Sequence, residues 1–94
     1  MTYKDDPHGY RRLRDFLLEI AQELSMFGND LEAELVLKAS LFYGSGSPSE
    51  FLGESRRALK AVLESTSNLS AETVRRIRAM IGEIDEGFHA VGSG

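Results

Sequence analysis

Apolar positions recur along the chain at helical spacing and are separated by short polar breaks. The first stripe consists of Leu13, Phe16, Leu17, Ile20, Leu24 and Phe27. Residues three and four apart lie on one face of a helix, so this spacing predicts an amphipathic helix over about residues 7–27. Asp6 is expected to be its N-cap, Pro7 its first residue and Gly28 its left-handed stop.

The clearest helix start is the quartet Ser47-Pro48-Ser49-Glu50, which follows the break Gly44-Ser45-Gly46. A Ser with Glu three residues later forms a capping box, and Pro at the first helical position has no N–H to leave unpaired. One helix over about 30–43 is therefore expected to end before this break. Another is expected over about 48–64.

A fourth helix is expected over about residues 71–91. Ser70 is its predicted N-cap, and Leu69 can pack on Val74 as a hydrophobic staple. Its apolar positions alternate by three and four: Val74, Ile77, Ile81, Ile84, Phe88 and Val91. This row of apolar positions is too short to indicate a coiled coil, so it favours packing within a bundle. Ile81, in the middle of the row, is expected to be buried.

The connections between these four helices are short, which is typical of antiparallel neighbours. We therefore predict an all-α fold, an antiparallel up-down four-helix bundle that forms a single domain over residues 1–94. Helical hairpins of this size also build solenoids. That alternative is less favoured, because the two hairpins share no repeated motif and such arrays usually need three or more repeats.

The composition excludes several kinds of chemistry. The chain has 94 residues, 11 Lys plus Arg, 15 Asp plus Glu and a net charge of −4, and it contains no cysteine. Disulfides, thiolate catalysis and Cys-ligated zinc are therefore excluded. The N-terminal stretch is polar and no long apolar run follows, so neither a signal peptide nor a membrane span is predicted, and a cytoplasmic location is expected.

Arginines cluster at 11–14, 56–57 and 75–78. The first two clusters are expected at one end of the bundle, since the helices that carry them start at the same end. They define a set of candidate phosphate contacts: Arg11, Arg12, Arg14, Arg56 and Arg57. The alternative is that these arginines lie on exposed helix faces and pair with nearby carboxylates. The acidic net charge and the lack of a nucleic-acid-binding motif favour the alternative.

No catalytic, cofactor or metal site is predicted. Glu86 and His89 form the Glu-x-x-His pairing of di-iron bundles, with Asp85 one turn away, but the second pair that such a centre needs is missing. The 44–47 loop precedes a helix N-terminus that can attract anions, yet it lacks the lysine of a P-loop. We expect a protein that folds without metal or small molecule and is not an enzyme.

The second helix has more apolar positions than one bundle stripe needs. One broad arc consists of Leu31, Leu35, Val36, Ala39, Phe42 and Tyr43. Leu37 and Leu41 lie on a different side, and Leu18 and Met26 lie off the main stripe of the first helix. Such a surplus indicates either a broad monomeric core or a surface that meets a partner.

The leading hypothesis is a protein-interaction or regulatory module that recognises a partner through Leu37, Leu41, Leu18 and Met26. The partner is either a second copy, in a homodimer, or a protein with a basic surface, such as a toxin or nuclease, to suit the acidic balance. The alternative is a nucleic-acid-associated regulator that uses the arginine-rich end. An enzyme built on Asp85, Glu86 and His89 ranks third.

Overall fold

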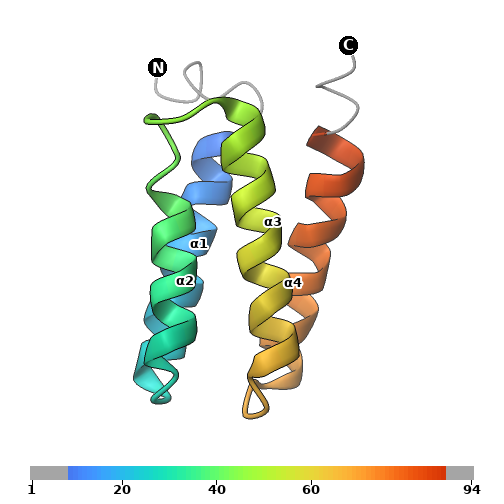
Figure 1. The fold of residues 1–94 in the computed structure, drawn as a ribbon. Helices are drawn as coiled ribbons and strands as arrows, with labels where there is room; N and C mark the ends of the chain where they lie inside the picture. The colour runs from blue at the N-terminus through green and yellow to red at the C-terminus, as the bar shows by residue number, and fades with distance from the viewer. Residues whose placement is uncertain (1–8, 89–94) are drawn as a thin grey trace.

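The computed structural model describes residues 9–88, and within this range the chain is helical and has no strand (Figure 1). The elements are α1 (Tyr10–Met26), α2 (Asp30–Ser40), α3 (Pro48–Ser65), α4 (Ala71–Glu83) and a π-helical turn, η2 (Ile84–Phe88). The predicted all-α, four-helix fold is confirmed. In Figure 1 consecutive helices run in alternating directions.

The two strongest start signals act as the sequence predicts. Ser47 Oγ accepts a hydrogen bond from Glu50 N at 3.1 Å, and Ser47 N donates to Glu50 Oε1 at 3.3 Å, which completes the capping box of α3. Ser70 Oγ accepts from Thr73 N at 3.1 Å and caps α4, without the reciprocal bond of a capping box. Each cap satisfies a backbone donor that lacks a partner inside the helix.

Two predicted boundaries are wrong, and the helix expected over 71–91 is α-helical only to Glu83, continues as η2 to Phe88, and beyond that lies outside the described residues. α1 begins at Tyr10 and not at Pro7, because Gly9 has a φ of 78°, in the left-handed region that a continuous right-handed helix excludes. Asp6 and Pro7 lie outside the described residues. α2 ends at Ser40, before Tyr43, and its last hydrogen bonds have the tighter i to i−3 pattern. The Ser40 hydroxyl also donates to Leu37 O at 2.6 Å, which competes with regular helix bonding there.

The buried core is drawn from all four helices and η2. Its fully buried side chains include Leu13, Leu17, Ile20, Leu24, Val36, Phe51, Leu59, Val62 and Ile77. On α4 the buried positions are Thr73, Ile77 and Met80, continued by Ile84. The predicted row of apolar positions through Ile81 is therefore rotated: Ile81 is only half-buried, because Met80 faces the core in its place.

The helices are not equally close to one another. α1 packs most closely against α2, and α2 against α3, whereas α4 makes fewer close approaches to the other helices. Exposed ion pairs join α4 and η2 to α1 and α3. Arg76 lies 2.6 Å from Glu19 of α1, and Arg12 of α1 pairs with Glu83 of α4. The described helices include none that is long and apolar enough to cross a membrane.

Candidate interaction surface

α2 places its small side chains toward the core and its large ones toward solvent. Its buried residues are Ala33, Val36, Ala39 and Ser40. Its leucines are exposed: Leu31 by 76%, Leu35 by 45%, Leu37 by 44% and, at the C-cap, Leu41 by 70%. A surface helix usually buries its large apolar residues, so this distribution is reversed. The predicted inward arc of α2 is therefore wrong for Leu31 and Leu35.

A groove of about 500 Å³ runs between α1 and α2. Its lining residues are Leu18, Ala21, Gln22, Ser25, Met26, Asp30, Ala33, Glu34 and Leu37. Buried Ala21 and Ala33 form its floor, because alanines let the two helices approach closely. The exposed apolar side chains of Leu18, Met26 and Leu37 stand on its walls. The structure thus brings together three of the four residues predicted for an interface.

The fourth predicted residue, Leu41, does not line the groove but extends the same apolar surface along the outer face of α2. Phe27 is also exposed, by 62%, directly after α1. It had been assigned to the core stripe of the first helix, but it is the C-cap residue and no longer has helical geometry. We call the exposed side chains of Leu31, Glu34, Leu35, Leu37, Lys38 and Leu41 the outer α2 face.

Asp30 and Glu34 supply the charges of the groove, and none of the described residues that line it is cationic. Asp30 Oδ1 accepts a hydrogen bond from Ser25 Oγ at 3.4 Å, which joins the two walls where α1 passes into α2. Lys38 follows Glu34 by one turn, just outside the groove. The outer α2 face therefore carries one charge of each sign between its leucines.

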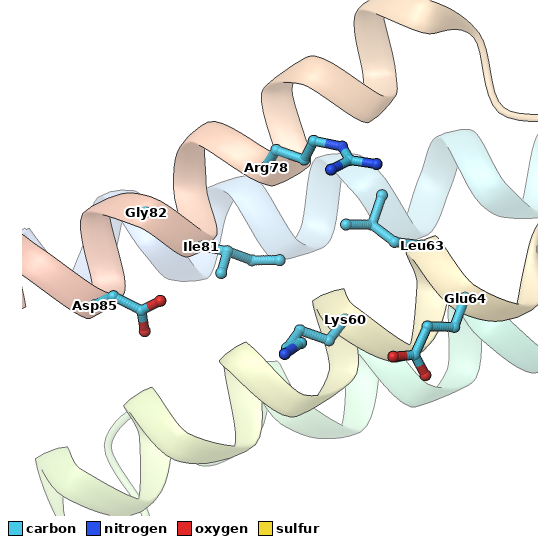
Figure 2. A pocket seen from close by; sticks show the side chains of 7 residues that line it. All are labelled: Lys60, Leu63, Glu64, Arg78, Ile81, Gly82 and Asp85. Carbon is cyan, nitrogen blue, oxygen red and sulfur yellow. The ribbon is translucent and has the colours of Figure 1, made fainter.

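A second cleft, also of about 500 Å³, lies between α3 and α4. Figure 2 shows its lining side chains: Lys60, Leu63, Glu64, Arg78, Ile81, Gly82 and Asp85. Ile81 and Arg78 extend from α4 toward Leu63 of α3. Two cations and two carboxylates surround this small apolar centre, so the cleft offers mixed charges and less exposed apolar surface than the α1–α2 groove.

Asp85 is the best-defined charged group of the α3–α4 cleft. Arg56 Nε donates to Asp85 Oδ1 at 2.6 Å, and this hydrogen bond lowers the pKa of the Asp85 carboxyl below its ordinary value. Partial desolvation opposes the shift, and the charges of Arg56 and Lys60 add to it. The pair joins α3 to η2 across the end of the cleft. Asp85, one of the residues considered for an enzyme, thus forms a structural ion pair.

The predicted phosphate contacts are largely directed at carboxylates. Arg14 Nε lies 2.9 Å from Asp15, and Arg57 lies 3.5 Å from Glu54, both local pairs of the kind that the alternative interpretation expects. Arg12 and Arg56 pair over a longer range with Glu83 and Asp85, as described above. Arg11 is half-buried and also has an interaction partner. Phosphate binding stays a prediction, and these pairs weigh against it.

Two other candidates gain no support. A Cβ on Gly46 would lie 2.7 Å from Glu50 Oε1, and this oxygen also accepts a hydrogen bond from Ser47 N, so a carboxylate already lies beside the loop where an anion would bind. The second candidate is a metal site, and its histidine, His89, lies outside the described residues. Within residues 9–88 no three His, Asp or Glu side chains are grouped so that they could hold a metal ion.

The fold and the exposed surface define an all-α, four-helix protein with an apolar groove. No family model matches the chain, and no curated protein or solved structure is significantly similar to it.

Proposed function

We propose that this protein is an interaction module that binds another protein chain through the outer α2 face and the adjoining α1–α2 groove. The observation that carries the proposal is the reversed amphipathicity of α2. Two alanines, a serine and Val36 fill its inner face, while Leu31 and Leu41 are more than two-thirds exposed on its outer face. The monomer makes no use of these leucines in its core.

The apolar area is large enough for recognition. Complete burial of a leucine side chain contributes about 1.5–3 kcal/mol, and a half-exposed leucine contributes roughly half of that when a partner covers it. The outer face offers four leucines, and Leu18 and Met26 continue it across the groove. Their summed gain, on the order of several kcal/mol, is comparable to the entropic cost of association. The exposed leucines thus offset this cost, and the apolar side chains that a partner brings supply the surplus that holds the two chains together.

The inner face of α2 shows that the exposed leucines are not misplaced core residues. Ala33 and Ala39 are 5% and 3% exposed, and Ala33 also lines the groove between α1 and α2. A rotation of α2 that buried Leu31 and Leu35 would bring large side chains into spaces that now hold alanines. Overpacking of this kind costs about 1–3 kcal/mol for each inserted side chain. The observed orientation of α2 is thus favoured by packing.

Site-specific photo-crosslinking in the cells that make the protein tests the proposal. A photoreactive amino acid replaces Leu41 on the outer α2 face, and a matched variant carries it at Ala79, an exposed position on α4. The proposal predicts a protein adduct of defined mass from position 41 and none from position 79. Adding Leu37→Asp is expected to abolish the adduct. Equal crosslinking from both positions, or no protein adduct from position 41, would overturn the proposal.

A further inference from the structure

The outer α2 face is arranged symmetrically about Val36. Leu31, Glu34 and Leu35 precede Val36 by five, two and one positions, and Leu41, Lys38 and Leu37 follow it by the same offsets. Leucine thus matches leucine, and an acid matches a base. All six side chains are exposed, whereas Val36 itself is fully buried on the opposite side of the helix.

Helical geometry places these side chains on one face. Successive residues are rotated by about 100°, so positions 31, 34, 38 and 41, separated by three, four and three residues, form one stripe. Leu35 and Leu37 lie along the two sides of that stripe. Leu41 keeps right-handed helical dihedral angles of φ −71° and ψ −17°, so the stripe extends to it beyond the last residue of α2.

A two-fold axis that passes close to position 36 brings this stripe against itself in antiparallel orientation. Each residue then lies opposite the residue at the matching offset on the second copy. Leu31 meets Leu41 of the second copy, and Glu34 meets Lys38 of the second copy, with both contacts repeated by symmetry. The interface then contains two Glu34–Lys38 ion pairs, with a Leu31–Leu41 contact at each end, an arrangement found in antiparallel helix pairs.

We propose that two copies of this chain associate through the outer α2 face, with the two α2 helices antiparallel and Glu34 of each copy paired with Lys38 of the other. This inference rests on the proposed function of the surface and specifies its partner. A parallel arrangement in the same register places Glu34 against Glu34 and Lys38 against Lys38, and like charges at an interface exclude wrong pairings. The charges therefore specify both the partner and its direction.

Complementary charge exchange tests this pairing. Glu34→Lys and Lys38→Glu are made separately, and Arg75→Glu, at an exposed position of α4, serves as the control for a changed charge. Sedimentation velocity measures association, and circular dichroism confirms that each variant is folded. The wild type and the control are expected to be dimeric, whereas each single variant is expected to associate on the order of tenfold more weakly or worse.

The mixture of the two single variants is the decisive sample. One copy then has lysine at both positions and the other has glutamate at both, so a mixed dimer regains both ion pairs. A dimer in the mixture, together with weak association of each variant alone, supports the pairing. A monomeric wild type, single variants that associate as tightly as the wild type, or a mixture without recovery would each overturn it.

The photo-crosslinking experiment separates this inference from the proposed function. An adduct at position 41 whose mass is that of two copies agrees with the pairing. An adduct to a different protein leaves the interaction module in place and overturns the second copy as its partner. No adduct at position 41 overturns the proposed function itself.

Discussion

α2 and α4 use apolar side chains in opposite ways. α4 directs large residues such as Ile77 and Met80 to the core, as an amphipathic helix of a monomer does. α2 directs Ala33 and Ala39 inward and leaves Leu31 exposed. The difference shows that apolar content alone does not identify the inner face of a helix. Which face turns inward also depends on the size of the side chains that the neighbouring helices can accommodate.

The two helices also differ in how closely they pack. Small inner residues let α2 lie close to both α1 and α3, whereas α4 makes fewer close approaches and is joined to its neighbours by exposed ion pairs such as Arg76–Glu19. Exposed pairs contribute only about 0–1 kcal/mol each. The attachment of α4 must therefore depend on its few buried side chains. Substitutions on the inner face of α4 should affect folding, and substitutions on the outer α2 face should affect association.

The largest expected effect is that of Ile77→Ala on α4. Ile77 is fully buried, so the lost transfer energy and the cavity should lower the free energy of unfolding by about 2–5 kcal/mol. Urea denaturation measures the change. Ile81→Ala is the matched control. Because Ile81 is half-buried at the α3–α4 cleft, its replacement should lower the free energy of unfolding clearly less. Equal losses for the two variants would show that α4 does not face the core as described.

A smaller effect is expected on the inner face of α2. Ala39→Leu should lower the free energy of unfolding by about 1–3 kcal/mol, because a larger side chain does not fit between α2 and its neighbours. Leu31→Ala, on the outer face, should change the stability of the monomer by no more than about 0.5 kcal/mol. Thermal denaturation in dilute solution compares the two. A larger loss for Leu31→Ala would mean that the faces of α2 are reversed.

The Arg56–Asp85 pair predicts a weak dependence of stability on pH. The hydrogen bond from Arg56 lowers the pKa of Asp85 in the folded protein, so the unfolded chain binds this proton more readily. The stabilisation is present above the ordinary carboxyl pKa and is lost as the pH falls through the lowered one. Asp85→Asn should therefore be less stable than the wild type at neutral pH and equally stable in strong acid.

Denaturation midpoints of the wild type and Asp85→Asn across this pH range measure the effect. Because the pair is exposed, added salt should reduce the difference at neutral pH. A difference that is the same at every pH would show that the ion pair is not its source.

The sequence predicted those features that depend on neighbours in the chain. The Ser47 and Ser70 caps form because donor and acceptor lie three residues apart, so no other helix is needed to align them. Local spacing is sufficient for such features. Spacing also placed Leu18 and Leu37 off the main stripes of their helices, but it left open whether they widen the core or meet a partner, and the structure shows both exposed.

The features that the sequence did not predict depend on how the helices are placed against each other. Leu31 and Leu35 were placed on the main apolar arc of the second helix by their spacing, and only the packing of α2 against its neighbours shows that alanines face inward instead. The Arg56–Asp85 pair joins residues 29 positions apart, and its formation depends on the register of α3 against η2. An alanine-lined face opposite leucines is the sequence signal that could have revealed the orientation of α2.

The most direct test of the account is a comparison of folding and association in the Leu37→Asp, Leu41→Lys double variant. The central claim is that the outer α2 face serves association and not the core of the monomer. The variant should keep its helices by circular dichroism and unfold within about 0.5 kcal/mol of the wild type in dilute solution, where association does not contribute. In concentrated solution it should sediment as a monomer, whereas the wild type sediments as a dimer. Loss of helical structure in the variant, or unchanged association, would contradict the claim.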